Sequence, residues 1–174
     1  VMLGEEARKC IDDTTSSSFA ADLKKWLQIM EAYEGGGHAY HATLPTDAIV
    51  KFHASLKETE DYGFDKVKAE QQELGDKVRA MMSSYGFKSL AAGGYGAPGV
   101  VVWYTAAPDI HNGSKFAAAG LQTAAGVPLM CDEPEDFRTF RVGLFGLDKL
   151  HNVDRTVASL EKALSQVTGG TNVR

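Results

Sequence analysis

The spacing of hydrophobic positions is helical through the first half of the chain and mixed in the second half. Residues 4–11 predict a short helix with a charged face, and apolar residues three and four positions apart predict three more helices, over 19–33, 47–61 and 64–85. Gly63 and Gly86 follow the third and fourth of these, and glycine readily adopts the positive φ that ends a helix. A last helix is expected after Asn152, a residue type that caps helix N-termini, and it should end at Gly169–Gly170.

Between the fourth and the last helix the pattern is typical of strands. Residues 100–104 are β-branched and aromatic, and 87–91 is a short candidate strand. Residues 127–130 predict an edge strand, because Pro128 cannot donate to a ladder. A helix over 115–124, opened by Ser114, separates these strands. The order predicts an α+β (α/β) layer, a mainly antiparallel sheet of three or four strands with helices on one face.

Residues 138–145 (Arg-Thr-Phe-Arg-Val-Gly-Leu-Phe) are the most unusual predicted strand, because two arginines interrupt its apolar positions. Phe140 and Val142 fall on one face and Arg141 falls on the other. We expect a buried strand, in which a guanidinium is costly unless an acceptor meets it. A structural ion pair with an Asp or Glu and a bound carboxylate ligand would both satisfy it, and the pattern alone leaves both open.

A second unusual stretch is residues 35–46, Gly-Gly-Gly-His-Ala-Tyr-His-Ala-Thr-Leu-Pro-Thr. The hydroxyls of Tyr40 and Thr43 stand just before a predicted helix N-terminus, a common place for phosphate to bind. His38 and His41 have no suitable third ligand nearby, so we predict no metal site. The alternative is a helix entry with incidental polar residues.

Composition narrows the classes of function. The 174 residues are 44% hydrophobic and 24% charged, as in a globular protein. A net charge of -5 disfavours nucleic acid and anionic membranes as partners, and no apolar run approaches the ~20 residues of a membrane span. Cys10 and Cys131 match no metal or redox spacing, which predicts a reducing, cytoplasmic setting. Position 1 is not Met, which predicts a fragment or a processed chain.

Residues 40–45 (Tyr-His-Ala-Thr-Leu-Pro) and 140–146 (Phe-Arg-Val-Gly-Leu-Phe-Gly) lie about a hundred residues apart. In this order they resemble motifs of the alanine–glyoxylate (serine–pyruvate) aminotransferase family, class V aminotransferases of the type I pyridoxal-phosphate fold. Residues 152–154 (Asn-Val-Asp) are similar to the start of the family's final helix. The resemblance extends from about residue 4 to residue 167.

The resemblance implies a homodimer that binds pyridoxal 5'-phosphate between its subunits. It implies that Tyr40 and Thr43 bind the cofactor phosphate of the neighbouring site, and that Arg141 binds the α-carboxylate of small amino and keto acids. The implied reaction moves an amino group from alanine or serine to glyoxylate or pyruvate. The family's Schiff-base lysine would lie before Val1, so we expect no catalytic residue in this chain, which should be inactive by itself. Arg138 is assigned a structural role.

The resemblance also implies a division into two parts. Residues 1–62 would be the end of the large cofactor-binding domain and the interdomain helix, and 63–174 the C-terminal small domain. Residues 131–134 (Cys-Asp-Glu-Pro) replace a glycine pair of the family, which leaves substrate preference open. The alternatives are a stand-alone, non-catalytic binding or dimerisation module, and another class V enzyme such as a cysteine desulfurase or a phosphonate transaminase. The desulfurase is disfavoured because neither cysteine stands in a convincing mobile nucleophile loop.

Overall fold

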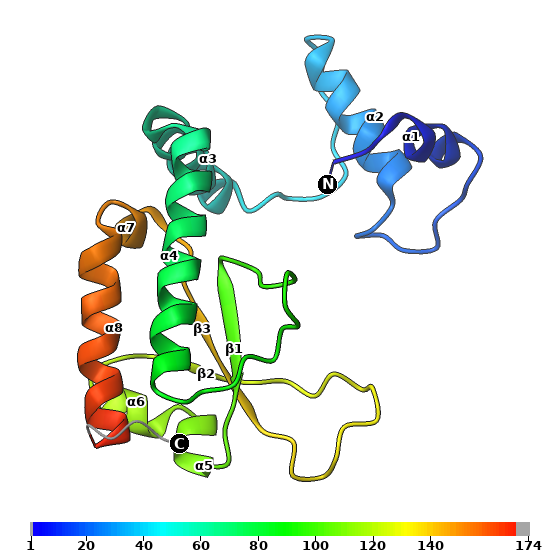
Figure 1. Cartoon of the computed structure of the whole chain (residues 1–174). Coiled ribbons are helices and arrows are strands. Elements are labelled where there is room, and N and C mark those ends of the chain that lie inside the picture. The colour runs from blue at the N-terminus through cyan, green and yellow to red at the C-terminus, as the bar shows by residue number, and fades with distance from the viewer. Residues whose placement is uncertain (1, 170–174) are drawn as a thin grey trace. The chain divides into compact units, whose positions relative to one another are not determined.

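The computed structural model describes residues 2–169 (Figure 1). The chain divides into two compact units, Val1–His53 and Ala54–Arg174. This division lies within helix α3 (Thr46–Tyr62). The domain boundary that the resemblance implies, after residue 62 at the turn that ends this helix, stays a prediction. No helix among residues 2–169 is both long enough and apolar enough to cross a membrane.

The first unit contains α1 (Glu5–Asp12), α2 (Leu23–Glu34) and the beginning of α3. An ion pair of 2.5 Å between Arg8 Nη2 and Glu31 Oε1 joins α1 to α2. The core of this unit is small. Its buried apolar side chains among the described residues are those of Ile11 and Ile29.

Helix α2 begins later than predicted because of its cap. The side chain of Asp22 accepts a hydrogen bond of 3.0 Å from the backbone N–H of Lys25, which sets the first turn at Leu23. The two predicted helix-ending glycines are confirmed. Gly63 separates α3 from α4 (Phe64–Ser84) with φ +101°, and Gly86 follows α4 with φ +85°.

The second unit is built on a three-stranded antiparallel sheet in the order β1-β3-β2. Its strands are β1 (Val100–Tyr104), β2 (Ala124–Ala125) and β3 (Thr139–Gly143). β3 is central and pairs along its whole length with β1, from Val100 opposite Gly143 to Tyr104 opposite Thr139. The mixed α+β architecture with a small antiparallel sheet is therefore confirmed. The predicted strand over 87–91 is reduced to a bridge between Ser89 and Trp103.

One face of this sheet carries the core. Helices α4 and α8 (Val153–Thr168) lie on the same side of the sheet in Figure 1. The Phe140 ring lies 5.3–5.8 Å, between centroids, from the rings of Phe87, Trp103 and Phe116. The buried apolar residues that meet there are Leu74, Val78, Met81, Met82, Val101, Trp103, Ile110, Phe116, Phe140, Val142, Leu144, Leu150, Val153, Leu160, Leu164 and Val167. The predicted cap of α8 is confirmed, since Asn152 Oδ1 accepts from the Arg155 backbone N–H at 2.9 Å.

The predicted edge strand over 127–130 is wrong. The edge strand is β2, and the backbone N–H groups of Leu129, Met130 and Cys131 bond instead to the Glu133 carboxylate. Met130 has φ +60° and, just after it, Asp132 has φ +59°, a left-handed conformation outside the β region of regular strands. The Glu133 carboxylate thus accepts hydrogen bonds from N–H groups that, in a strand, would donate to a neighbouring strand.

The predicted helix over 115–124 is too long, and its cap is wrong. The structure has three short helices here and near β3, namely α5 (Pro108–His111), α6 (Ser114–Ala118) and α7 (Leu147–Leu150). Gly113, with φ +79°, precedes α6, and Ser114 is already helical. Gly120, with φ +83°, ends the turn that follows α6. Glycine at that position therefore helps to stop the helix.

Candidate functional site

Arg141 lies at the centre of the sheet of the second unit. It is opposite Val102 of β1 and opposite Ala124 of β2, so its backbone is paired on both sides. Directly opposed residues share a face of the sheet, whereas the neighbours Phe140 and Val142 point to the other face and are buried. The Arg141 side chain therefore belongs to the face that carries no core.

The prediction that Arg141 is part of a buried strand is wrong in one respect. Only one face of β3 carries the core, and Arg141 and Gly143 on the other face are exposed. Among the described residues, no carboxylate lies within 4.0 Å of its guanidinium, and the same is true of Arg138. Within residues 2–169, Arg141 therefore lacks the structural ion pair that was the alternative to a bound ligand. Arg138, which was assigned a structural role, has no ion-pair partner there either.

The surroundings of Arg141 on the open face are apolar and aromatic. Val100 is 39% exposed and Tyr104 is 37% exposed, and both come from β1. Lys88 Nζ lies 5.6 Å from the centroid of the Tyr104 ring, which adds a second cation near this face. A guanidinium without a carboxylate partner, set among apolar side chains, is suited to an anion that arrives from outside.

The structure brings Tyr40 and Thr43 together in the first unit. Tyr40 Oη and Thr43 Oγ1 lie 3.3 Å apart, and Tyr40 is 71% exposed. The N-terminus of α3 begins at Thr46, three residues after Thr43. Two adjacent hydroxyls that reach solvent have the chemistry to hold phosphate oxygens, so these residues fit the group that the resemblance assigns to them.

His41 anchors this loop. Its ring centroid lies 4.3 Å from that of Phe19 and 5.0 Å from that of Trp26, and its Nε2 lies 3.1 Å from the Phe19 carbonyl oxygen. His38 instead lies against the Tyr33 ring at 5.9 Å. Both histidines thus contact aromatic rings, and residues 2–169 contain no group of three His, Cys, Asp or Glu side chains that could hold a metal ion.

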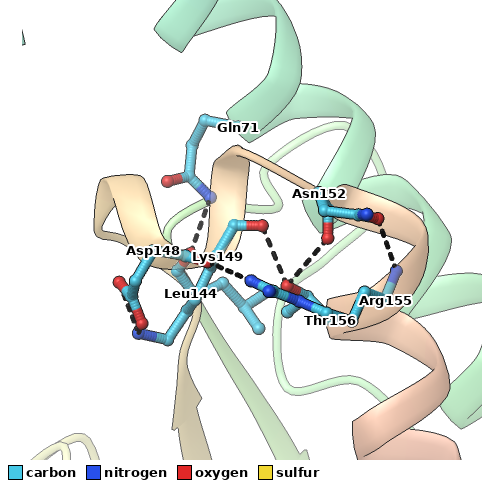
Figure 2. A network of polar contacts seen from close by, with 7 residues as sticks. All are labelled: Gln71, Leu144, Asp148, Lys149, Asn152, Arg155 and Thr156. Atoms are coloured by element: carbon cyan, nitrogen blue, oxygen red, sulfur yellow. Dashed lines mark hydrogen bonds and ion pairs between the residues drawn. The ribbon is translucent and has the colours of Figure 1, made fainter.

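Sequence reasoning missed a polar network around the turn from α7 to α8 (Figure 2). Arg155 Nη2 donates to the Asp148 carbonyl oxygen at 2.8 Å. Thr156 Oγ1 donates to the Lys149 carbonyl oxygen at 2.8 Å, and it lies 3.1 Å from the Asn152 carbonyl oxygen. These side chains fasten the segment through which β3 connects to the last helix.

Gln71 is the part of this network that the sequence signalled. It is the one polar residue in the apolar stripe of α4, at a position that should face the core. Its Nε2 donates to the Pro98 carbonyl oxygen at 3.0 Å and lies 3.5 Å from that of Leu144. A half-buried amide thus joins α4 to the segments at the ends of β1 and β3. Arg155 and Thr156 carry no comparable signal, because they resemble ordinary surface residues of a helix.

Neither a protein-family model nor a curated protein matches the chain.

Proposed function

We propose that this chain is the C-terminal portion of a class V, pyridoxal-phosphate-dependent aminotransferase, in which Arg141 binds the α-carboxylate of the amino and keto acids. One observation carries the proposal. The Arg141 guanidinium is exposed at the centre of the open sheet face and has no carboxylate partner within residues 2–169. Its planar fork can hold a carboxylate by two parallel hydrogen bonds.

The backbone around Arg141 supports a role in orienting the substrate. Pairing with Val102 on one side and Ala124 on the other holds its Cα within the sheet. A carboxylate held from a rigid strand keeps the bond at the neighbouring carbon in a constant direction, and such positioning supplies much of an enzyme's rate enhancement.

Tyr40 and Thr43 would hold the phosphate of pyridoxal 5'-phosphate through their hydroxyls. When bound, this cofactor supplies the electron sink for reaction at the α-carbon of an amino acid. In the proposal, the lysine that binds the cofactor covalently belongs to a part of the protein before Val1. The contribution of this chain is to bind and orient substrate and cofactor, with alanine or serine as donor and glyoxylate or pyruvate as acceptor.

Helix α3 supports a protein that extends beyond this chain, as the proposed further domain and the proposed homodimer both require. It contains no buried residue, although its sequence is amphipathic. Its exposed apolar side chains are those of Ile49, Val50, Phe52 and Leu56. Apolar residues grouped along one helix favour a surface that another protein segment covers.

The substrate role of Arg141 is tested by kinetics of the full-length protein loaded with pyridoxal phosphate. We expect Arg141→Ala to raise the KM for alanine or serine by about tenfold or more, because the lost charge-assisted contact is worth roughly 1.5–3 kcal/mol. Arg138→Ala is the matched control, since Arg138 is also exposed and without an ion pair among the described residues. An unchanged KM in Arg141→Ala, or an equal rise in Arg138→Ala, contradicts the assignment.

The enzyme class is tested separately by the absorbance spectrum. The full-length protein mixed with pyridoxal phosphate should gain the visible band of the lysine-bound cofactor, and alanine or serine should change that band. A protein without such a band would be the non-catalytic binding module. A band that responds to cysteine alone would favour the desulfurase.

A further inference from the structure

A pocket of about 260 Å³ lies beside the network of Figure 2, in the second unit. Val142, Leu144 and Leu160, three residues of the core, form part of its wall. Lys149 and Arg155 also line it, and Arg141 does not. The pocket thus combines apolar side chains with two basic groups and the Asp148 carboxylate, and the proposed substrate arginine is not part of it.

The network of Figure 2 holds Arg155 in place at this pocket. Its backbone N–H bonds to the cap residue Asn152, and its Nη2 donates to the Asp148 carbonyl oxygen at 2.8 Å. A guanidinium has five N–H donors, and this contact uses one of them. Within residues 2–169 no carboxylate pairs with Arg155, so most of its donors are available to a ligand.

The charges around the pocket favour a monovalent anion. Lys149 Nζ lies 3.3 Å from Asp148 Oδ2, and both residues line the pocket, so their charges offset each other. Asp154, in the first turn of α8, pairs with Lys77 of α4 at 2.6 Å and does not line the pocket. Of these charges, that of Arg155 alone is not offset by an ion pair among the described residues, and it lies at the N-terminus of the 16-residue helix α8. A helix N-terminus also favours a bound anion.

We infer that this pocket binds a small monocarboxylic acid with an apolar body, whose carboxylate meets Arg155 and whose body lies over Val142, Leu144 and Leu160. The volume is below the ~300–1,000 Å³ of pockets for drug-sized ligands, so the acid has a short chain or a single ring. This site differs from the one proposed for the amino-acid carboxylate, and it stands whether or not the chain belongs to an aminotransferase.

Calorimetric titration of the full-length protein with hexanoate tests the inference. The experiment uses the Arg141→Ala background, which removes the other proposed carboxylate site. We expect saturable binding with one site per chain, and at least tenfold weaker binding of hexanol, which lacks the charge. Arg155→Met should weaken hexanoate binding at least tenfold.

Two further variants keep the test decisive if Arg155→Met disturbs the α7–α8 turn. Ser159 lines the pocket but takes no part in the network, so Ser159→Leu should block binding and leave the fold intact. Lys162→Met removes a charge elsewhere on α8, outside the pocket, and should bind hexanoate as the background does. Absence of binding in the background, equal binding of hexanol, or full binding by Ser159→Leu would each overturn the inference.

Discussion

The two faces of the β1–β3 pair differ more than any other two regions of the second unit. Phe140 and Trp103 point to the covered face and are 0% exposed, whereas Arg141, the next residue, is exposed. Both faces are made by the same five-residue strands. What distinguishes them is the cover, since the helices that pack on the sheet bury one face and leave the other to solvent.

Thr139 shows that the burial of a side chain on β3 depends on which segments cover it, and not only on the alternation of side chains along the strand. It has the strand parity of Arg141, yet it is 1% exposed. The segment after β2 lies against it, with the Gly126 N–H donating to the Thr139 carbonyl oxygen at 2.8 Å. The face of β3 opposite the core is therefore covered at Thr139, at one end of the strand, and exposed at Arg141, in its centre.

The largest expected effect is on the covered face. Phe140→Ala removes a ring that contacts three other aromatic rings, and it should lower the free energy of unfolding of the second unit by about 3–5 kcal/mol. Amide hydrogen exchange of β1 and β3 measures this quantity for the sheet itself. Arg141→Ala, one residue along, should change it by no more than about 0.5 kcal/mol. Similar losses in both variants would contradict the distinction between the faces.

A smaller effect on stability is expected at Gly126, where the segment after β2 covers Thr139. In Gly126→Ala the new Cβ would stand 1.7 Å from Thr139 Oγ1 and 2.9 Å from the Thr139 carbonyl carbon, so the β2 segment must move. We expect a loss of about 1–3 kcal/mol, seen as faster exchange of the residue 126 amide.

Gly99→Ala is the control for that substitution. No heavy atom outside its neighbours lies within 4 Å of the new Cβ, and Gly99 is not among the described glycines with positive φ. Its effect on stability should stay below about 1 kcal/mol. A neutral Gly126→Ala would show that the segment does not press on Thr139.

The smallest effect concerns the loop that leads into β3. Hydrogen bonds from backbone N–H groups, that of Cys131 foremost, lower the pKa of the Glu133 carboxyl below its ordinary value of 4.5. Because the folded-state pKa is the lower one, the stabilisation of this loop is present above pH 4.5 and is lost as the pH falls through the folded value.

Amide shifts of Met130 and Cys131 should therefore titrate on acidification below pH 4.5, with protection of the strands unchanged. Glu133→Gln should remove this titration. Glu135→Gln is the control, because Glu135 is exposed on the same loop and makes none of these hydrogen bonds. A loop whose amides titrate equally in Glu133→Gln would contradict the role of this carboxylate.

The sequence pattern predicted helix ends and strands correctly where neighbouring residues determine the backbone conformation. The glycines at 63 and 86, the cap at Asn152 and the strands around residues 100–104 and 139–143 depend on conformational preference and periodicity, which neighbouring residues largely determine. The largest errors occur at 127–130 and 115–124. There a carboxylate four residues away and a left-handed glycine decide the backbone, and periodicity does not report either.

The candidate site was predicted in part for the same reason. Tyr40 and Thr43 are close in sequence, so their hydrogen bond follows from a short loop. The surroundings of Arg141 depend on Val102 and Ala124, which the sheet brings from distant parts of the chain. Arg155 gave no signal, because its role at the pocket depends on residues from β3 and on the loop before β2.

The amino-acid sequence by itself determined that this chain forms amphipathic helices and a small, mainly antiparallel sheet, with an arginine in one of its strands. It also determined that Arg141 and Phe140 point to opposite faces, since side chains alternate along any strand. Only the tertiary structure decided that the arginine faces solvent without a carboxylate partner among the described residues. The physical reason is that burial and ion pairing depend on which segments cover a face, and the covering helices α4 and α8 lie outside the strand itself, α4 far before β3 and α8 after it.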